Sequence, residues 1–289
     1  MNFLGKWFVS RMHSIALRVL WRIRNYINLT PASDQEAYYR LRLLSSSIPR
    51  YQLGTISLPF GRLQFIDALS LRYQFLEIFL QRSYDFEAER PDPLIFDCGA
   101  NIGLSVIRFK LRYPQSRIVA FEADHIIAEV LEGNLDRLDF KEGVKVVQAA
   151  VWTKTSKTRF LSNRADSGRV DEQKGDKLVD AVRLADWITE PVDLLKLDIE
   201  GAEYEVIHDL CETGKIKLIH RMICEIHGRS REDQTRLAEI LATLTIHNFH
   251  FTFNHARCAP DLPGEVKPTS FSAASDGRFL LHLYAWQET

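Results

Sequence analysis

The chain has 289 residues, 46% hydrophobic and 26% charged, which is ordinary for a soluble globular protein with one large domain or one domain and an extension. Its formal net charge is -1, so the overall charge gives no reason to expect a nucleic-acid partner. The four cysteines form no C-x-x-C pair, which favours reduced thiols in a cytoplasmic protein over a disulfide framework or a zinc site.

Residues 1–30 carry five basic side chains and no acidic one. At helical spacing Arg11, Arg18 and Arg22 share one stripe beside an apolar stripe, which predicts a basic amphipathic helix. Such a helix could lie on an anionic membrane surface, or it could pack on its own domain or on a second subunit. The sequence leaves this choice and the oligomeric state open. No stretch reaches the roughly 18 apolar residues of a membrane-spanning helix.

Residues 1–90 are predicted to form an N-terminal extension of helices and a hairpin. Ser33, with Glu36 three residues later, predicts the start of a helix. Two β-like segments joined through Pro59 and Gly61 predict a hairpin, and "SLRYQFLEIFLQRSY" predicts another helix. The segment "ERPDP" then interrupts the pattern, so we expect a second domain over residues 91–289.

From residue 94 onwards apolar strands alternate with helices, which specifies a mostly parallel sheet with helices on both faces. The predicted strands cover residues 94–99, 117–124, 144–152, 193–201 and 221–228, and the predicted helices cover residues 103–113, 126–138, 203–212 and 231–244. Polar residues 153–176 are expected to be irregular, with a mobile loop near the mouth of the site. Two last β-like segments, 249–254 and 278–286, have no helical pattern between them and predict an antiparallel pair at one edge.

The turn after the first of these strands predicts a nucleoside site, because ligands of such folds lie at the carboxyl ends of the strands. Gly99 and Gly103 let the backbone approach a ligand, and Glu122 follows at the spacing of a carboxylate that binds ribose hydroxyls. Asn101 stands where a dinucleotide site needs glycine, and Asp97 would repel a pyrophosphate. Asp97 could instead pair with a cationic amino-acid group. A nucleoside joined to an amino acid without phosphate describes S-adenosylmethionine (SAM).

The motifs "FDCGANIGLS", "IVAFEAD", "VQAAVW", "LLKLDIEGAEYEVI" and "CEIHG" occur in this order, and the set resembles the FkbM family of SAM-dependent methyltransferases. The resemblance covers roughly residues 56 to 227. It implies a Rossmann-like methyltransferase fold and O-methylation of a hydroxyl, often on a sugar or a natural product. It also implies that SAM contacts Asp97, Gly99, Ala100, Asn101, Gly103, Glu122, Ala123, Gln148, Ala149, Ala150 and Asp198.

One departure concerns adenine. Ala149 and Ala150 stand where many methyltransferases bear an acid for the adenine amino group. Backbone groups or Gln148 would then have to read adenine in this chain.

Four side chains at adjacent strand ends are the catalytic candidates: Asp198, Glu200, Glu225 and His227. An alcohol needs a general base, and His227 is the first choice because its ordinary pKa lies near neutral pH. Glu225 could orient that ring or act as the base itself. Asp198 is expected near the SAM methionine or the acceptor, with Glu200 beside it. The simpler account of the "DIEG" motif is that it fixes a loop and caps a helix.

A divalent cation at these oxygens is possible but not favoured, because no spacing signature demands it, and the metal content is left unknown. The sequence thus predicts a cytoplasmic SAM-dependent O-methyltransferase with a small-molecule or glycan acceptor. The alternatives are a SAM-binding scaffold without catalysis, a nucleic-acid methyltransferase and a dehydrogenase. "DIEG" replaces the Pro-Pro-aromatic turn that would hold a flipped base, so nucleic acid is not expected.

Overall fold

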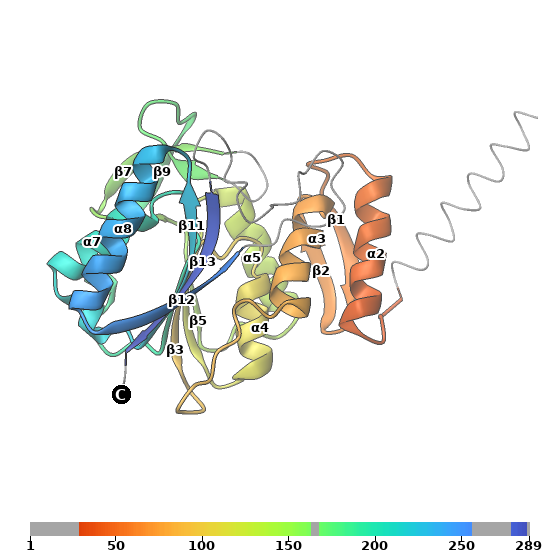
Figure 1. Cartoon of the computed structure of the whole chain (residues 1–289). Helices are drawn as coiled ribbons and strands as arrows, with labels where there is room; N and C mark the ends of the chain where they lie inside the picture. Colours follow the sequence, from red (N-terminus) through yellow and green to blue (C-terminus); the bar gives the residue numbers. More distant parts are fainter. Residues whose placement is uncertain (1–28, 163–167, 256–278, 288–289) are drawn as a thin grey trace, which may run out of the picture. The chain divides into compact units, whose positions relative to one another are not determined.

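A computed structural model describes residues 29–162, 168–255 and 279–287, so the helix expected within residues 1–30 lies almost entirely outside the described residues. The chain divides into two compact units, residues 1–80 and 81–289 (Figure 1). Residues 81–90 belong to the second unit, because Asp85 pairs with Arg108, and both Arg112 and the Tyr113 hydroxyl donate to the carbonyl of Phe86.

The first unit contains the predicted hairpin and two helices. Strands β1 (Gly54–Leu58) and β2 (Gly61–Phe65) pair antiparallel. Helix α2 (Asp34–Ser47) begins after Ser33, whose side chain accepts a hydrogen bond from the Glu36 backbone at 3.2 Å, as the sequence predicts. Helix α3 (Ala68–Phe75) continues into a π-helical turn, η1 (Leu76–Leu80). The helical segment thus ends four residues before the end of the predicted helix, which extends to Tyr84.

The second unit is built on a seven-stranded sheet in the order β12-β13-β11-β10-β3-β4-β5. It contains the strands β3 (Leu94–Cys98), β4 (Arg117–Phe121), β5 (Val144–Val147), β10 (Leu194–Leu197), β11 (Arg221–Gly228), β12 (Phe249–His255) and β13 (Phe279–Gln287). Strands β3, β4, β5, β10 and β11 are parallel, and β13 is antiparallel to both β11 and β12. The predicted fold class, a mostly parallel sheet with an antiparallel edge pair, is confirmed.

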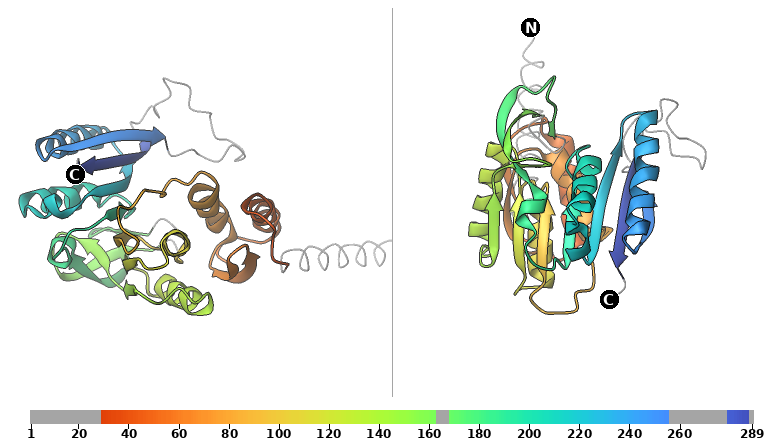
Figure 2. Two further views of the ribbon diagram at one scale, coloured as in Figure 1. Left: turned by 90° about the horizontal axis from the view of Figure 1, so that it is seen from below. Right: turned by 90° about the vertical axis from the view of Figure 1, so that its left-hand side faces the viewer.

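The strand order reverses beside β3, and this reversal places the site. The chain passes outward from β3 to β4 and β5, returns to β10 on the other side of β3, and continues to β11. Right-handed crossovers therefore put helices on opposite faces of the sheet in the two halves. Helices α4 (Leu104–Arg112) and α5 (His125–Arg137) cover one face, and α7 (Glu203–Glu212) and α8 (Arg231–Ile246) cover the other (Figures 1 and 2).

Two predictions for residues 144–176 are wrong. The expected strand 144–152 is divided between β5 and β6 (Ala150–Trp152), which lie in different sheets. The expected irregular stretch contains β7 (Ser156–Leu161) and β8 (Arg169–Val170), which join β6 and β9 (Lys177–Arg183) in a four-stranded sheet. Strand β7 buries only alternate residues. Its exposed face is polar, so the segment lacks the continuous apolar run by which the buried strands were predicted.

Asp124 attaches this second sheet to the main one. It caps α5, accepts a hydrogen bond from the Ser162 hydroxyl at 2.6 Å, and lies 3.1 Å from the Lys177 ammonium group. A short helix α6 (Leu184–Trp187) and a 3-10 turn η2 (Lys215–Leu218) complete the unit. Its core joins buried side chains of β3, β10 and β11 to those of α7 and α8.

Across the described ranges, no helix is both long enough and apolar enough to cross a bilayer.

Candidate functional site

The turn after β3 depends on glycine. Gly99, Asn101 and Gly103 all adopt positive φ angles, of 84°, 50° and 94°. Residues other than glycine and asparagine rarely adopt such angles. The Gly99 and Ala100 backbone N–H groups donate to the carbonyl of Phe121 at 3.0 and 2.9 Å, which fixes the turn against the end of β4. A Cβ atom at Gly99 would lie 1.9 Å from the carbonyl oxygen of Asp198. The turn is therefore in backbone contact with the end of β10.

Glu122, the predicted ribose carboxylate, lies at the end of β4 and holds this turn. It is 8% exposed and accepts hydrogen bonds from the backbone N–H groups of Asn101 and Asp124, both at 2.9 Å. Burial raises the pKa of Glu122 to about 7, although these two bonds favour the charged form. A carboxylate oxygen has two lone pairs, so each oxygen retains one for a ligand hydroxyl.

The adenine candidates follow β5. Gln148 is exposed, and Ala149 and Ala150 are buried at the start of the second sheet. Ala123 is half-buried beside Glu122. The structure thus places the Glu122 carboxylate and these four small or amide side chains at the neighbouring ends of β4 and β5.

Asp97 already has a cationic partner inside the protein. It is fully buried, its Oδ2 accepts a hydrogen bond from the Ser105 hydroxyl, and its Oδ1 lies 3.1 Å from the ammonium nitrogen of Lys196. The sequence-based interpretation gave this place to a ligand and missed Lys196. The available signal was a lysine inside the apolar run "LLKL", where a buried charge needs a partner.

Lys196 lies at the strand-order reversal, where it contacts residues that follow both β3 and β10. Its ammonium group donates to the carbonyl of Gly99 at 3.0 Å and lies 3.6 Å from a carboxylate oxygen of Asp198. Burial opposes the charge, but Asp97 and Asp198 together raise the pKa of Lys196, so the side chain stays protonated. The Tyr84 hydroxyl donates to Asp198 at 3.5 Å.

The predicted catalytic residues come together around His227. Its Nε2 lies 3.5 Å from Glu200 Oε2 and 3.8 Å from Glu225 Oε1. Its Nδ1 lies 3.1 Å from an oxygen of Glu203, a residue that the sequence-based interpretation did not single out. The signal for Glu203 was a second acid three residues after Glu200 in "DIEGAE", at the first position of a helix.

The charged side chains around His227 shift one another's pKa values. Burial opposes protonation of His227, but the hydrogen bond to Glu203 and the charges of Glu203, Glu200 and Glu225 raise the pKa of His227 to about 10. Burial raises the pKa of Glu200 to about 7, against the opposing charges of His227 and Arg229. In this arrangement His227 carries both ring protons at neutral pH, and the pKa of Glu200 lies near neutral pH.

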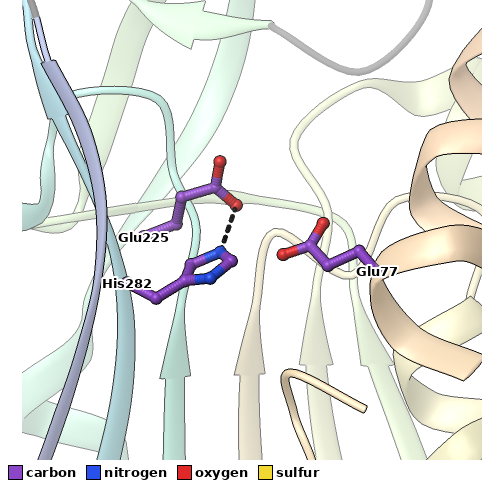
Figure 3. A group of neighbouring side chains, drawn as sticks. All are labelled: Glu77, Glu225 and His282. Carbon is purple, nitrogen blue, oxygen red and sulfur yellow. Dashed lines mark ion pairs between the residues drawn. The ribbon is translucent and has the colours of Figure 1, made fainter. Parts of the chain in front are cut away.

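A second histidine lies beside Glu225 on the next strand. His282 of β13 is the register partner of Glu225, it is 2% exposed, and its Nε2 lies 3.5 Å from Glu225 Oε2 (Figure 3). Glu225 therefore has a histidine near each of its carboxylate oxygens.

The donor set of Asp198, Glu200 and His227 is also compact. One donor atom from each residue lies within 4.8 Å of the others. Oxygen and imidazole donors at this spacing could hold a divalent cation, which the spacing of the residues along the sequence did not suggest.

Comparisons with known proteins agree on one family. The family model described as "Methyltransferase FkbM domain" matches residues 97–251. Methyltransferase sdnD of Sordaria araneosa is 30% identical over 234 residues, which cover 68% of this chain and 88% of that protein. The 31-O-demethyl-FK506 methyltransferase FkbM of Streptomyces tacrolimicus is 25% identical over the same shares of the two chains. The 2-O-methyltransferase NoeI of Sinorhizobium fredii is 28% identical over 41% of this chain and 58% of its own length.

Alanine substitutions at the two glycines of the turn test its geometry. Gly103→Ala should lower the free energy of unfolding by roughly 1–2 kcal/mol, the cost of a left-handed residue, because the nearest atom to its Cβ is 3.4 Å away. Gly99→Ala should cost clearly more, since the added Cβ meets the Asp198 carbonyl. Urea unfolding measures both. Equal losses would show that Gly99 and Asp198 are not in backbone contact.

Proposed function

Because this chain belongs to the FkbM methyltransferase family, we propose that it transfers the methyl group of SAM to a hydroxyl group of a carbohydrate or natural product. The chain is a methyltransferase of the EC 2.1.1 class. The names of two relatives, a 2-O-methyltransferase and a 31-O-demethyl-FK506 methyltransferase, support oxygen as the receiving atom.

The observation that carries the proposal is the adjacency of two different sites at the strand-order reversal. On the β4 side, Glu122 and the glycine turn offer a carboxylate and a closely approachable backbone, as a nucleoside requires. On the β10 and β11 side, Asp198, Glu200, Glu225 and His227 form a group of acids and one base. Backbone contact between Gly99 and Asp198 keeps the two sites next to each other.

In this proposal SAM occupies the first site. Glu122 accepts the ribose hydroxyls, and the turn from Gly99 to Gly103 faces the methionine and ribose portion with Ala100 and Asn101. Asp97 contributes through Lys196, because its own charge is balanced inside the protein. Gln148, Ala149, Ala150 and Ala123 border adenine. Asp198 lies where the methionine part of SAM meets the acceptor.

Methyl transfer requires an aligned hydroxyl that loses its proton. The SAM sulfonium is a good leaving group, so alignment of donor and acceptor supplies much of the rate. The hydroxyl proton passes to the group around His227. Since His227 holds both ring protons in the resting site, a carboxylate of Glu200 or Glu225 takes the proton while the imidazolium stabilises the neighbouring charge. The proposed role of His227 is therefore to stabilise charge beside the base, whereas the sequence predicted it as the base itself.

The protein is proposed to work in the cytoplasm on a small molecule or glycan, without nucleic acid as a substrate. In the described part of the chain Cys98, Cys211 and Cys224 are free thiols, as a reducing compartment allows. Membrane contact through residues 1–30 stays an untested prediction.

Titration and transfer assays separate the competing functions. We expect calorimetric binding of SAM and S-adenosylhomocysteine, no comparable binding of NAD, and transfer of labelled methyl from SAM to a molecule in extracts of the source organism. Turnover should persist in a chelator, since the base is supplied by protein. SAM binding without transfer to any extract component would favour a scaffold. Tight NAD binding with no response to S-adenosylhomocysteine would exclude a methyltransferase, and loss of turnover in chelator would assign the proton step to a metal.

Glu122→Ala should weaken SAM binding by roughly 1–3 kcal/mol, because the ribose hydroxyls and two backbone N–H groups lose their acceptor. The matched control is Glu129→Ala, an exposed acid on α5, which should change nothing. With the pKa of Glu122 at about 7 in the free protein, and hydroxyl donors favouring the charged form, affinity should be full above pH 7 and fall below it. Calorimetry at pH 6 and pH 8 checks this. A pH-independent wild-type affinity would show that Glu122 does not bind the ribose.

His227→Ala should leave SAM affinity intact and lower turnover by ~10²–10³, because the carboxylate that takes the proton loses the neighbouring imidazolium. His208→Ala, an exposed histidine on α7, is the control that should keep wild-type turnover. Steady-state kinetics with SAM titrations measures both. Near-normal turnover of His227→Ala would leave the proton step to Asp198, Glu200 or Glu225 without help from the ring.

A further inference from the structure

Glu203 is a fully buried acid at the first position of α7. Its Oε1 accepts a hydrogen bond from the Ile199 backbone N–H at 3.0 Å, and its Oε2 accepts one from the Gly201 backbone N–H at 2.8 Å. These two bonds close the loop that follows β10 and fix both carboxylate oxygens in space. A charged group buried in this way costs free energy unless it is well paired, so the position of Glu203 is tightly determined.

The third contact of this carboxylate is not needed to close the loop. His227 Nδ1 lies 3.1 Å from Glu203 Oε1, which is a hydrogen-bond distance, and both side chains are largely shielded from water. The Glu203 carboxylate therefore links the loop after β10 and helix α7 to His227 of β11. Glu225 was the residue predicted from the sequence to orient this ring. Its Oε1 lies 3.8 Å from Nε2 of His227, which is too far for a hydrogen bond.

A hydrogen bond at Nδ1 decides where Nε2 points. With Nδ1–H held by Glu203, Nε2 lies on the opposite side of the ring, toward Glu200 and Glu225. Without it, the ring could rotate and exchange the roles of its two nitrogens. A fixed ring keeps the reacting geometry, and an error of about 1 Å in such geometry can cost ~10² in rate.

We propose that Glu203 is a positioning residue for methyl transfer, which holds Nδ1–H of His227 and thereby directs Nε2 toward Glu200 and Glu225, the carboxylates that take the acceptor proton. This inference rests on the proposed function. Glu203 itself touches neither the acceptor nor SAM.

Nitrogen-15 histidine NMR of the whole protein tests the contact without any assay of turnover. The His227 signals are identified by their loss in His227→Ala. We expect a protonated, hydrogen-bonded Nδ1 in the wild type and a changed Nδ1 signal in Glu203→Gln. Glu205→Gln, on the same helix and bound to Arg236 at the surface, should leave the signal unchanged. A wild-type Nδ1 that lacks a proton or a hydrogen bond overturns the proposal, even if no Glu203 variant folds.

Kinetics then separates positioning from loop support. Glu203→Gln should lower kcat by ~10–10² with little change in KM for SAM. In a His227→Ala background the same substitution should cause no further loss, because Glu203 acts through the ring. An equal loss in both backgrounds would assign Glu203 to the loop alone and overturn the proposal. Glu203→Asp, which keeps the charge but is shorter, serves if Glu203→Gln does not fold, and the same comparison applies to it.

The two proposals fail differently. If the wild type transfers no methyl group, the proposed function fails whatever the NMR spectrum shows. If transfer is normal but the Nδ1 signal is indifferent to Glu203, only the positioning role fails.

Discussion

The ion pair between Lys196 and Asp97 is the interaction on which the site depends. It joins the two central strands where the order of the sheet reverses, and its ammonium group also reaches the Gly99 carbonyl and Asp198. Removal of one partner from a buried pair typically costs about 3–5 kcal/mol, because the other charge is left unpaired. The pair fixes the backbone of the glycine turn and balances Asp97 internally. Asp198, the second carboxylate near Lys196, is the more exposed of the two, with 26% of its side chain exposed.

This balance divides the carboxyl edge of the sheet into two chemically different halves. Toward β4, the carboxylate of Glu122 binds backbone N–H groups, and the neighbouring Asp124 is paired with Lys177. Toward β11, acids surround one imidazolium, and each carboxylate there has a cationic or N–H partner. In the proposed function, the first half binds the adenosine part of SAM and the second half takes part in proton transfer. Neither half needs a separate domain, since both follow from side chains placed at the ends of neighbouring strands.

Much of the second unit could be predicted from sequence, because buried parallel strands are continuous apolar runs and their helices have strong caps and periodicity. Helix α7 and strand β11 have the predicted limits, and the antiparallel edge pair is present. Residues 144–176 could not be predicted, since pairing of β6 and β7 in a separate sheet depends on tertiary contacts that no local pattern encodes. The candidate acids could be named from the sequence because Glu122 and Asp198 directly follow strands and Glu225 lies near the end of one. Lys196 and Glu203 were missed because one lies inside a strand and the other inside a helix, where charged side chains usually face solvent.

The place of β13 in the sheet has a consequence for biosynthesis. It lies between β11 and β12, so the strand that bears Glu225 and His227 has an unpaired edge until residues 279–287 have left the ribosome. Contacts between segments so far apart in sequence form late and slowly. The turn after β3 and its partners Glu122, Lys196 and Asp198 all lie before residue 199, so these residues leave the ribosome earlier. The edge of β11, the strand that carries Glu225 and His227, is completed only when residues 279–287 pair with it.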